Sequence, residues 1–448
     1  MDMLSGSLVD KILKFALPLA ITGILQQLFN AADIAVVGQF VGKNAMAAVG
    51  SNSPVISLIV TLFLGISLGA NVVIANLTGQ GDRERVNKAV HTAIIVALLS
   101  GVFGAVLGEI FAVLILKTMS VPEEILDMAV LYLRIYMAGL PVVLLYNFES
   151  AIFRSQGDTA TPLICLVISG LINVGLNLFF VCVMKMTVSG VALATMISNL
   201  ISSLMLFYFL KTRDSIVKLS LKSLKIDPKL LLWILKIGIP AGVQGMVFSI
   251  SNVIVQSAIN SLGADVMAAS SAAFNVEIFV YFIINSFGQA CTTFVGQNYG
   301  AGQLKRCVRI TRLCLLLDAG ATAVISGLLF LTGKQLLGIF NGDPVIIEYG
   351  YIRITFILAA ELINVVMEVL SGCMRGYNYS TLPAIMTFVG VSGVRIVWVY
   401  TIFASHRDFR VLMGAYPASW FAAAAALTAA YFYVKRQVFK KQEEMRNS

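Results

Sequence analysis

The sequence has 448 residues, of which 58% are hydrophobic and only 12% are charged. Soluble domains carry about a quarter charged residues, so this composition excludes an ordinary soluble protein. The formal net charge of +9 does not indicate a nucleic-acid partner, because such a protein gathers its basic residues on the face of a folded soluble domain.

Apolar stretches long enough to cross a bilayer recur from one end of the chain to the other. A hydrocarbon core about 30 Å thick needs about 20 residues of helix, and lipid forces each backbone segment to satisfy its own hydrogen bonds. The sequence therefore predicts an all-α integral membrane protein with twelve transmembrane helices. Their expected ranges are 12–38, 51–77, 90–116, 129–153, 162–184, 188–210, 232–260, 266–296, 308–333, 350–373, 383–404 and 413–434.

These spans divide the chain into two lobes without a separate soluble domain. We expect an N-terminal six-helix lobe at 1–210, a basic cytoplasmic linker at 211–231, a C-terminal six-helix lobe at 232–434 and a basic cytoplasmic tail at 435–448. Lys and Arg gather in alternate loops and in the tail, which predicts that both termini face the cytoplasm. The expected location is a multi-pass position in the cytoplasmic (inner) cell membrane. The first apolar run is too long and too interrupted for a cleavable signal peptide.

The two lobes are predicted to be copies of one unit. "ILKFALPLAITG" at 12–23 matches "ILKIGIPAGVQG" at 234–245, and "FRSQGDTATPLI" at 153–164 matches "MRGYNYSTLPAI" at 374–385. Because six is an even number of spans, both copies enter the membrane from the same side. Transporters use such parallel repeats, with the substrate path at the interface of the halves. The repeat therefore favours a carrier over a channel.

A polar stripe in the first span follows Pro18. Thr22, Gln26, Asn30 and Asp33 are three or four residues apart and so share one helical face. Pro18 removes one backbone hydrogen bond and allows the helix to bend there. An aspartate in the middle of a membrane helix costs about 3 kcal/mol on insertion scales. Since burial disfavours the charged form, Asp33 is suited to exchange a proton or a sodium ion; a purely structural hydrogen bond is the alternative.

Further oxygen-bearing side chains come from the fifth and sixth spans. Asn173 and Asn177 are four residues apart in "INVGLNLFF", and Thr195 lies in "GVALATMISN". Their oxygens can bind Na⁺ or orient a protonated carboxyl group, whereas hydrogen bonding between helices is the alternative. The repeat partner of Asp33 is Val255. We therefore expect the ion site in the N-terminal lobe alone.

A second set of polar residues is expected to line a substrate cavity. Glu277 and Glu361 are intramembrane acids that would attract cations, and pairing with an arginine such as Arg353 or Arg395 is the alternative. The expected lining residues are Gln26, Gln244, Glu277, Gln289 and Glu361.

The sequence shows no pattern that is typical of an enzyme. It has no Walker A motif, no HExxH and no nucleophile with a base at a readable spacing. We expect no catalytic residue and no cofactor, so a transporter of this kind would be coupled to an ion gradient. The six cysteines form no CxxC and are interpreted as helix-packing residues.

The chain resembles the multidrug and toxic-compound extrusion (MATE) family, and within it the DinF-like branch. The resemblance covers both halves and rests on "LPLAITGILQQLFNAADIAVVG", "FRSQGDTATPLI", "NVGLNLFFV" and "VGQNYGAGQLKR", in this order. It implies two bundles that form a V-shaped cavity, alternating access, and antiport of drugs against H⁺ or Na⁺.

The resemblance also implies where the ion-coupling site lies. The residues carried over from the family are Asp33, Asn30, Asn173, Asn177, Thr195 and, more weakly, Tyr132. A bound Na⁺ would contact Asp33, Asn173 and Asn177. Family members often have a second acid where this chain has Asn177, so Asp33 is the one carboxylate at the expected site.

Three functions are compatible with this sequence. The first is an efflux antiporter that works as a monomer in the bilayer and exports organic cations or amphipathic drugs in exchange for H⁺ or Na⁺. The second is a flippase or exporter of a lipid-linked or narrow metabolite substrate, for which a basic cavity would be needed and Arg395 is the candidate residue. The third is a membrane receptor or scaffold, which would need an interaction domain that we do not expect here.

Overall fold

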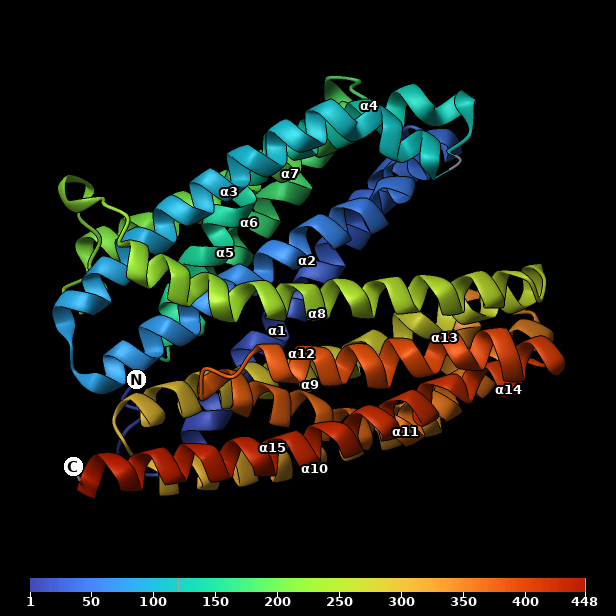
Figure 1. Ribbon diagram of the computed structural model, residues 1–448. Helices are drawn as coiled ribbons and strands as arrows, with labels where there is room; N and C mark the ends of the chain where they lie inside the picture. Colours follow the sequence, from blue (N-terminus) through green and yellow to red (C-terminus); the bar gives the residue numbers. More distant parts are fainter. Residues whose placement is uncertain (120, 448) are drawn as a thin grey trace. The chain divides into compact units, whose positions relative to one another are not determined.

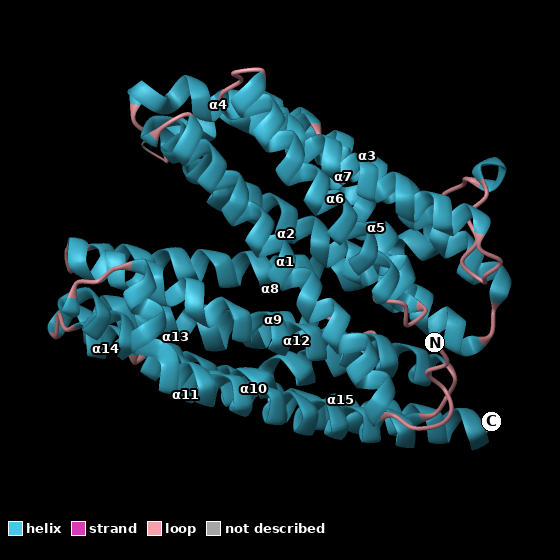
Figure 2. Ribbon diagram, turned by 180° about the vertical axis from the view of Figure 1, so that it is seen from behind, coloured by secondary structure: helices cyan, strands magenta, loops and turns pink. Residues whose placement is uncertain are grey.

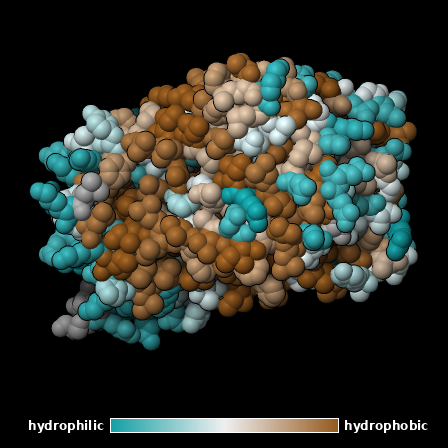
Figure 3. Space-filling model, turned by 90° about the horizontal axis from the view of Figure 1, so that it is seen from above, coloured by the Kyte–Doolittle hydropathy of each residue, from teal (hydrophilic) through white to brown (hydrophobic). Residues whose placement is uncertain are grey.

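The computed structural model describes residues 1–119 and 121–447, and over these residues the regular structure is entirely helical (Figures 1 and 2). Eleven of the helices are long and apolar enough to cross a membrane, and a bent pair raises the number to twelve. The predicted all-α membrane fold is therefore confirmed. Hydrophobic side chains cover much of the surface that is visible in Figure 3.

The helices follow the predicted spans closely. The first half contains α1 (Val9–Phe40), α2 (Lys43–Gln80), α3 (Arg83–Thr118), α4 (Glu123–Ala138), α5 (Leu140–Ser155), α6 (Ala160–Leu178), the π-helix η1 (Phe179–Val183) and α7 (Val188–Thr212). After the short 3₁₀-helix η2 (Leu221–Ser223), the second half contains α8 (Pro228–Asn260), α9 (Ala264–Gly300), α10 (Leu304–Phe340), α11 (Pro344–Gly376), α12 (Thr381–Thr387), the π-helix η3 (Phe388–Gly393), α13 (Val394–Trp398), the π-helix η4 (Val399–Phe403), α14 (Phe409–Met413) and α15 (Ala415–Asn447).

Three of the expected spans are not continuous α-helices. The span at 162–184 ends in the π-helix η1. The span at 129–153 is divided between α4 and α5, which are bent by 47°. Gly139 lies at the break and Pro141, one residue into α5, cannot donate a backbone hydrogen bond. The span at 383–404 changes between α-helix and π-helix along its length, through η3 and η4.

The chain forms two compact units whose boundaries lie inside helices. Unit 1 comprises Met1 and Ile21–Gly242, and unit 2 comprises Asp2–Ala20 and Val243–Ser448. Helices α1 and α8 therefore each contribute one part to each unit. Pro18 and Pro240 both lie close to the point where their helix passes from one unit to the other.

Each unit has its own core, and each core includes a helix segment from the other half of the sequence. In unit 2, α9, α10, α11 and α15 pack side by side (Figure 1), and Phe15 of α1 meets Phe294 edge-on with ring centroids 5.7 Å apart. In unit 1, α3 packs against α4 and α5, and Ile234 and Ile237 of α8 join the core. On the outer side of α3, a stripe of exposed apolar side chains is suited to lipid contact.

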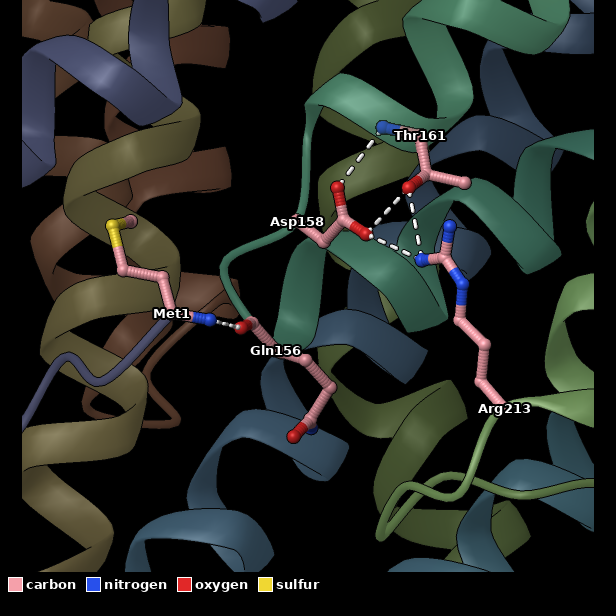
Figure 4. Close-up of polar contacts among 5 residues, drawn as sticks. All are labelled: Met1, Gln156, Asp158, Thr161 and Arg213. Carbon is pink, nitrogen blue, oxygen red and sulfur yellow. Dashed lines mark hydrogen bonds and ion pairs between the residues drawn. The ribbon is translucent and has the colours of Figure 1, made fainter.

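The motif at 153–164 builds the turn between α5 and α6 in unit 1 (Figure 4). Gly157 has φ +76°, a left-handed conformation that glycine adopts without strain. Asp158 accepts hydrogen bonds from the backbone N–H of Thr161 at 2.9 Å and from its hydroxyl at 2.6 Å, and Arg213 donates to Asp158 at 3.1 Å. Asn378, in the matching motif of the second half, also has a positive φ. The motif is thus a structural turn that both halves share.

Helices α2 and α8 cross at glycines inside unit 1. A Cβ atom on Gly65 would overlap the backbone of Gly242, and one on Gly238 would overlap the backbone of Ile66. Gly69 continues the same contact one turn along α2. Small residues four apart allow membrane helices to approach this closely.

We expect Gly65→Leu to destabilise unit 1 by about 1–3 kcal/mol, because the new side chain has no room at the crossing. Thermal unfolding of the purified protein in detergent measures this loss. Gly50→Leu is the matched control on the same helix, since a Cβ at Gly50 meets nothing within 4 Å. Equal losses in the two variants would contradict the close crossing.

Candidate functional site

The Asp33 side chain on α1 is buried in unit 1, with 5% of its surface exposed. The amide Nδ2 of Asn177 donates to one carboxylate oxygen at 2.5 Å, and the Thr195 hydroxyl donates to the other at 3.0 Å. Asn177 comes from α6 and Thr195 from α7, so three helices meet at this carboxylate.

A second amide extends the site along α6. Nδ2 of Asn177 also donates to Oδ1 of Asn173 at 3.2 Å. The two side chains face the same way because they are four residues apart on a helix, and the backbone becomes π-helical just beyond them, at η1. Oδ1 of Asn177 is buried and has no hydrogen-bond partner among the described residues.

The donors at Asp33 are all neutral. Within the part of the chain that the structure describes, no Lys, Arg or His side chain forms an ion pair with Asp33. Hydrogen bonds from an amide and a hydroxyl compensate only partly for the water that a buried carboxylate loses. A cation, either a proton or a metal ion, would therefore balance a charge that the surrounding side chains leave unbalanced.

Oxygen ligands for a hard cation lie within this group. Alkali cations prefer carboxylate, amide and hydroxyl oxygens, and these are supplied by Asp33, Asn173, Asn177 and Thr195. Oδ1 of Asn177 has no hydrogen-bond partner among the described residues. It could contact a cation at Asp33 if the amide group rotated by half a turn. The described residues contain no group of three or more His, Cys, Asp and Glu side chains that could hold a metal ion.

Two further predicted site residues differ in their placement. Tyr132 on α4 is buried and lies close enough to Asp33 to experience the charge of its carboxylate. Tyr136 lies one turn later and is stacked on Tyr132. It is also close enough to Asp33 to experience the charge of the carboxylate. Tyr136 is not among the residues predicted from the sequence, although its spacing of four from Tyr132 places both on one helical face. Asn30 is exposed, and no hydrogen bond joins it to Asp33.

The predicted cavity residues are divided between the two units. Gln26 is an exposed residue of unit 1, whereas the other four belong to unit 2. Gln289 donates to Asn285 at 2.7 Å, and Glu361 accepts from Asn364 at 3.0 Å. Among the described residues, no hydrogen bond joins the four members in unit 2 to one another.

The remaining two cavity candidates have charged partners. Oε1 of Gln244 accepts a hydrogen bond from Arg375 at 2.9 Å. Glu277 forms an ion pair with Arg353, with Nη2 to Oε1 at 2.5 Å and Nε to Oε2 at 3.2 Å. Pairing with an arginine was the alternative for Glu277 in the sequence, and this structure contains that pair.

The fold and site define a multi-pass helical membrane protein with an internal repeat and a buried carboxylate, Asp33, that has no ion pair among the described residues. The family model MatE matches residues 18–179 and 240–401, which is more than half of the chain. The chain therefore belongs to the MATE family of transporters. This membership agrees with the expectation that the chain is not an enzyme.

Named relatives and solved structures extend over nearly the whole chain. Probable multidrug resistance protein YoeA of Bacillus subtilis (strain 168) is 28% identical over 441 residues, 96% of this chain and 94% of the relative. Probable multidrug resistance protein NorM of Thermotoga maritima is 28% identical over 399 residues, 86% of this chain and 84% of the relative. The structure described as "Crystal structure of MATE in the bent conformation" has a TM-score of 0.90 at 21% identity and covers 100% of this chain and 98% of its own; it shows the fold alone.

Proposed function

We propose that this transporter is a secondary active multidrug efflux antiporter of the DinF-like branch, which exports organic cations or amphipathic drugs in exchange for H⁺ or Na⁺. The observation that carries the proposal is the buried Asp33 carboxylate, whose hydrogen-bond donors are all neutral. A carrier needs a ligand that favours one conformation over another, and a cation that neutralises Asp33 is such a ligand. The names of the relatives support a drug substrate.

The proposed cycle uses the partners of Asp33. In the outward-facing state Asp33 takes up a proton or Na⁺, and its hydrogen bonds from Asn177 and Thr195 weaken because the acceptor loses its charge. Helix α1 then bends at Pro18, the substrate loses its site, and it leaves to the outside. The lobes return, and the ion is released to the cytoplasm.

We infer that both termini and the 211–231 segment lie in the cytoplasm and that the protein acts as a monomer in the cell membrane. The distribution of Lys and Arg supports this orientation. The 211–231 segment is held against α3, where His91 bonds to the Ser220 carbonyl oxygen at 2.9 Å and Asn87 to that of Lys218 at 2.9 Å.

Transport of ethidium, a fluorescent organic cation, by the purified protein in proteoliposomes tests the proposal. A pH gradient and a Na⁺ gradient are imposed separately, and empty liposomes serve as the control. Transport driven by one gradient and not by the other supports antiport and identifies the ion. No gradient-driven transport of ethidium or of several other drug cations would overturn the proposal in favour of a lipid-linked or narrow metabolite substrate.

The number of carboxylates at the site should govern the choice of ion. We expect Asn177→Asp to bind Na⁺ about tenfold more tightly than wild type, equivalent to about 1.4 kcal/mol, because two carboxylates balance a bound Na⁺ more fully than one. Thermal unfolding across a NaCl series, with choline chloride holding the ionic strength constant, measures the apparent Kd. Asn147→Asp, a half-buried position on α5, should leave the Na⁺ dependence unchanged; the same shift in that variant would contradict a specific site.

A further inference from the structure

The Arg395 side chain in unit 2 is completely buried, with 0% of its surface exposed. It lies on α13, the short α-helical segment between the π-helices η3 and η4. Nε donates to the Ser419 hydroxyl at 3.2 Å, and Nη1 donates to Oδ1 of Asn252 at 2.6 Å. Nη2 has no hydrogen-bond partner among the described residues. Two of the three guanidinium nitrogens thus have neutral partners and the third has none.

No carboxylate in the described residues balances the charge of Arg395. Glu277 has both carboxylate oxygens engaged by Arg353. The Tyr416 ring lies close to both arginines, with its centroid 5.8 Å from Arg353 and 4.5 Å from Arg395. Of these two guanidinium groups, Arg353 has a carboxylate partner, whereas Arg395 has no ion pair among the described residues. Buried charges without a partner are costly, and within membranes they mark functional paths.

Arg395 occupies the position in the second repeat that Asn173 occupies in the first. The two segments that match the family model begin at Pro18 and Pro240 and have the same length. Counting from these starts, Asn173 falls on Arg395 and Asp33 falls on Val255. The carboxylate site of the first repeat is thus replaced in the second by a site whose only charge is positive.

We propose that Arg395 anchors an anion-binding site in unit 2, which takes a phosphate or carboxylate group carried on an aromatic body. The free Nη2 and the neighbouring Nη1 provide a planar fork that matches two oxygens of such a group once Asn252 moves aside. The ring of Phe248, which is only partly buried and has its centroid 5.2 Å from the guanidinium, offers a face for an aromatic group.

The surroundings of Arg395 allow a ligand to reach it. Asn252 and Phe248 contact the guanidinium and are themselves only partly buried, so a ligand that displaces the Asn252 side chain would reach Arg395. The flanking π-helices η3 and η4 depart from regular helical bonding, as helices often do at functional sites. The site is separate from Asp33 and does not depend on the proposed exchange of drug for cation.

Comparing the binding of flavin mononucleotide (FMN) with that of riboflavin distinguishes recognition of the phosphate from recognition of the ring. The two probes differ by the phosphate group alone. Equilibrium dialysis with the purified full-length protein in phospholipid-free detergent gives each Kd. We expect wild type to bind FMN at least about tenfold more tightly than riboflavin, a difference of about 1.4 kcal/mol. In Arg395→Gln, FMN should bind as weakly as riboflavin. Arg410→Gln, an exposed arginine of the same unit, should behave as wild type.

Two further variants keep the test decisive if Arg395→Gln does not fold. Arg395→Lys retains the charge but loses the fork, and should bind FMN with an affinity between those of wild type and riboflavin. Asn252→Ala removes the neutral side chain that accepts a hydrogen bond from Arg395. This variant should bind FMN at least as tightly as wild type. Equal binding of FMN and riboflavin by wild type, or FMN binding that none of the Arg395 and Asn252 variants changes, would overturn the proposal.

Competition distinguishes the sources of the anionic group. Inorganic phosphate that displaces FMN from wild type would show that the phosphate alone is recognised. Phosphatidylglycerol that displaces FMN in an Arg395-dependent manner would identify a lipid headgroup as the occupant and overturn the aromatic part of the proposal. The dialysis uses no ion gradient, so its failure is distinct from failure of the antiport experiment.

Discussion

Replacing Asp33 with asparagine is expected to abolish ion-coupled efflux while the protein still folds. The asparagine side chain has nearly the same size and can keep a hydrogen bond to Thr195 or Asn177, which hold the carboxylate oxygens in wild type. It cannot change its charge, so neither a proton nor Na⁺ would favour one conformation over the other. Ethidium transport driven by the effective gradient should fall to the level of empty liposomes, and size-exclusion chromatography should show an unchanged monodisperse protein.

Three matched variants define what the Asp33 result means. Asp33→Glu keeps a titratable group but moves it by one methylene, so we expect partial activity. Asp127→Asn removes an exposed carboxylate from α4 of the same unit and should transport as wild type does. Thr195→Val removes one donor and leaves the carboxylate in place, so coupling should weaken without disappearing. Gradient-driven transport at the wild-type rate by Asp33→Asn would refute a coupling role for this residue.

The Asp33 contacts could be anticipated because polar groups are expensive in lipid. An acid within an apolar span must face another helix or water, and the sequence offered two amides and a hydroxyl in the fifth and sixth spans. The structure places Asn177 and Thr195 on the carboxylate and Asn173 behind them. Helical spacing alone did not predict how deeply each side chain is buried. Asn30 lies in the same polar stripe as Asp33 but is exposed.

The exchange of helix segments between the units could not be anticipated. Hydrophobic patterning shows that α1 and α8 cross the membrane, but it does not show which neighbours each half of a helix contacts. Those contacts depend on the close approach of backbones at Gly65, Gly238 and Gly242, which is visible only in three dimensions. The π-helices could not be predicted from the sequence for a related reason. A short π-helical segment has longer hydrogen-bonded turns than an α-helix, but it leaves the apolar character of the span unchanged.

The Arg353 environment shows the limit of repeat symmetry. Arg134 and Arg353 are repeat mates in "YLRI" and "YIRI", and both have a glutamate partner. The Arg134–Glu109 pair is open to solvent or headgroups, with side chains 45% and 54% exposed, whereas the Arg353–Glu277 pair is 5% and 9% exposed. Equivalent positions thus place the same chemistry in opposite environments.

Removing one member of the buried pair is expected to cost about 3–5 kcal/mol of unfolding free energy, because it leaves a charge without a partner inside unit 2. Glu277→Gln tests this directly, since the glutamine retains the shape and loses the charge. The double variant Glu277→Gln with Arg353→Met should recover much of the loss, because no buried charge of the pair remains. Thermal and chemical unfolding in detergent measure both changes.

The exposed repeat mate supplies the matched control for this prediction. Glu109→Gln breaks the Arg134–Glu109 pair, whose atoms are 3.1 Å apart, and should cost about 0–1 kcal/mol because exposed ion pairs contribute little. A similar loss from Glu109→Gln and Glu277→Gln would contradict the buried environment of Arg353. A large loss from Glu277→Gln alone would show that the charge of Glu277 holds α9 against α11 through its pair with Arg353.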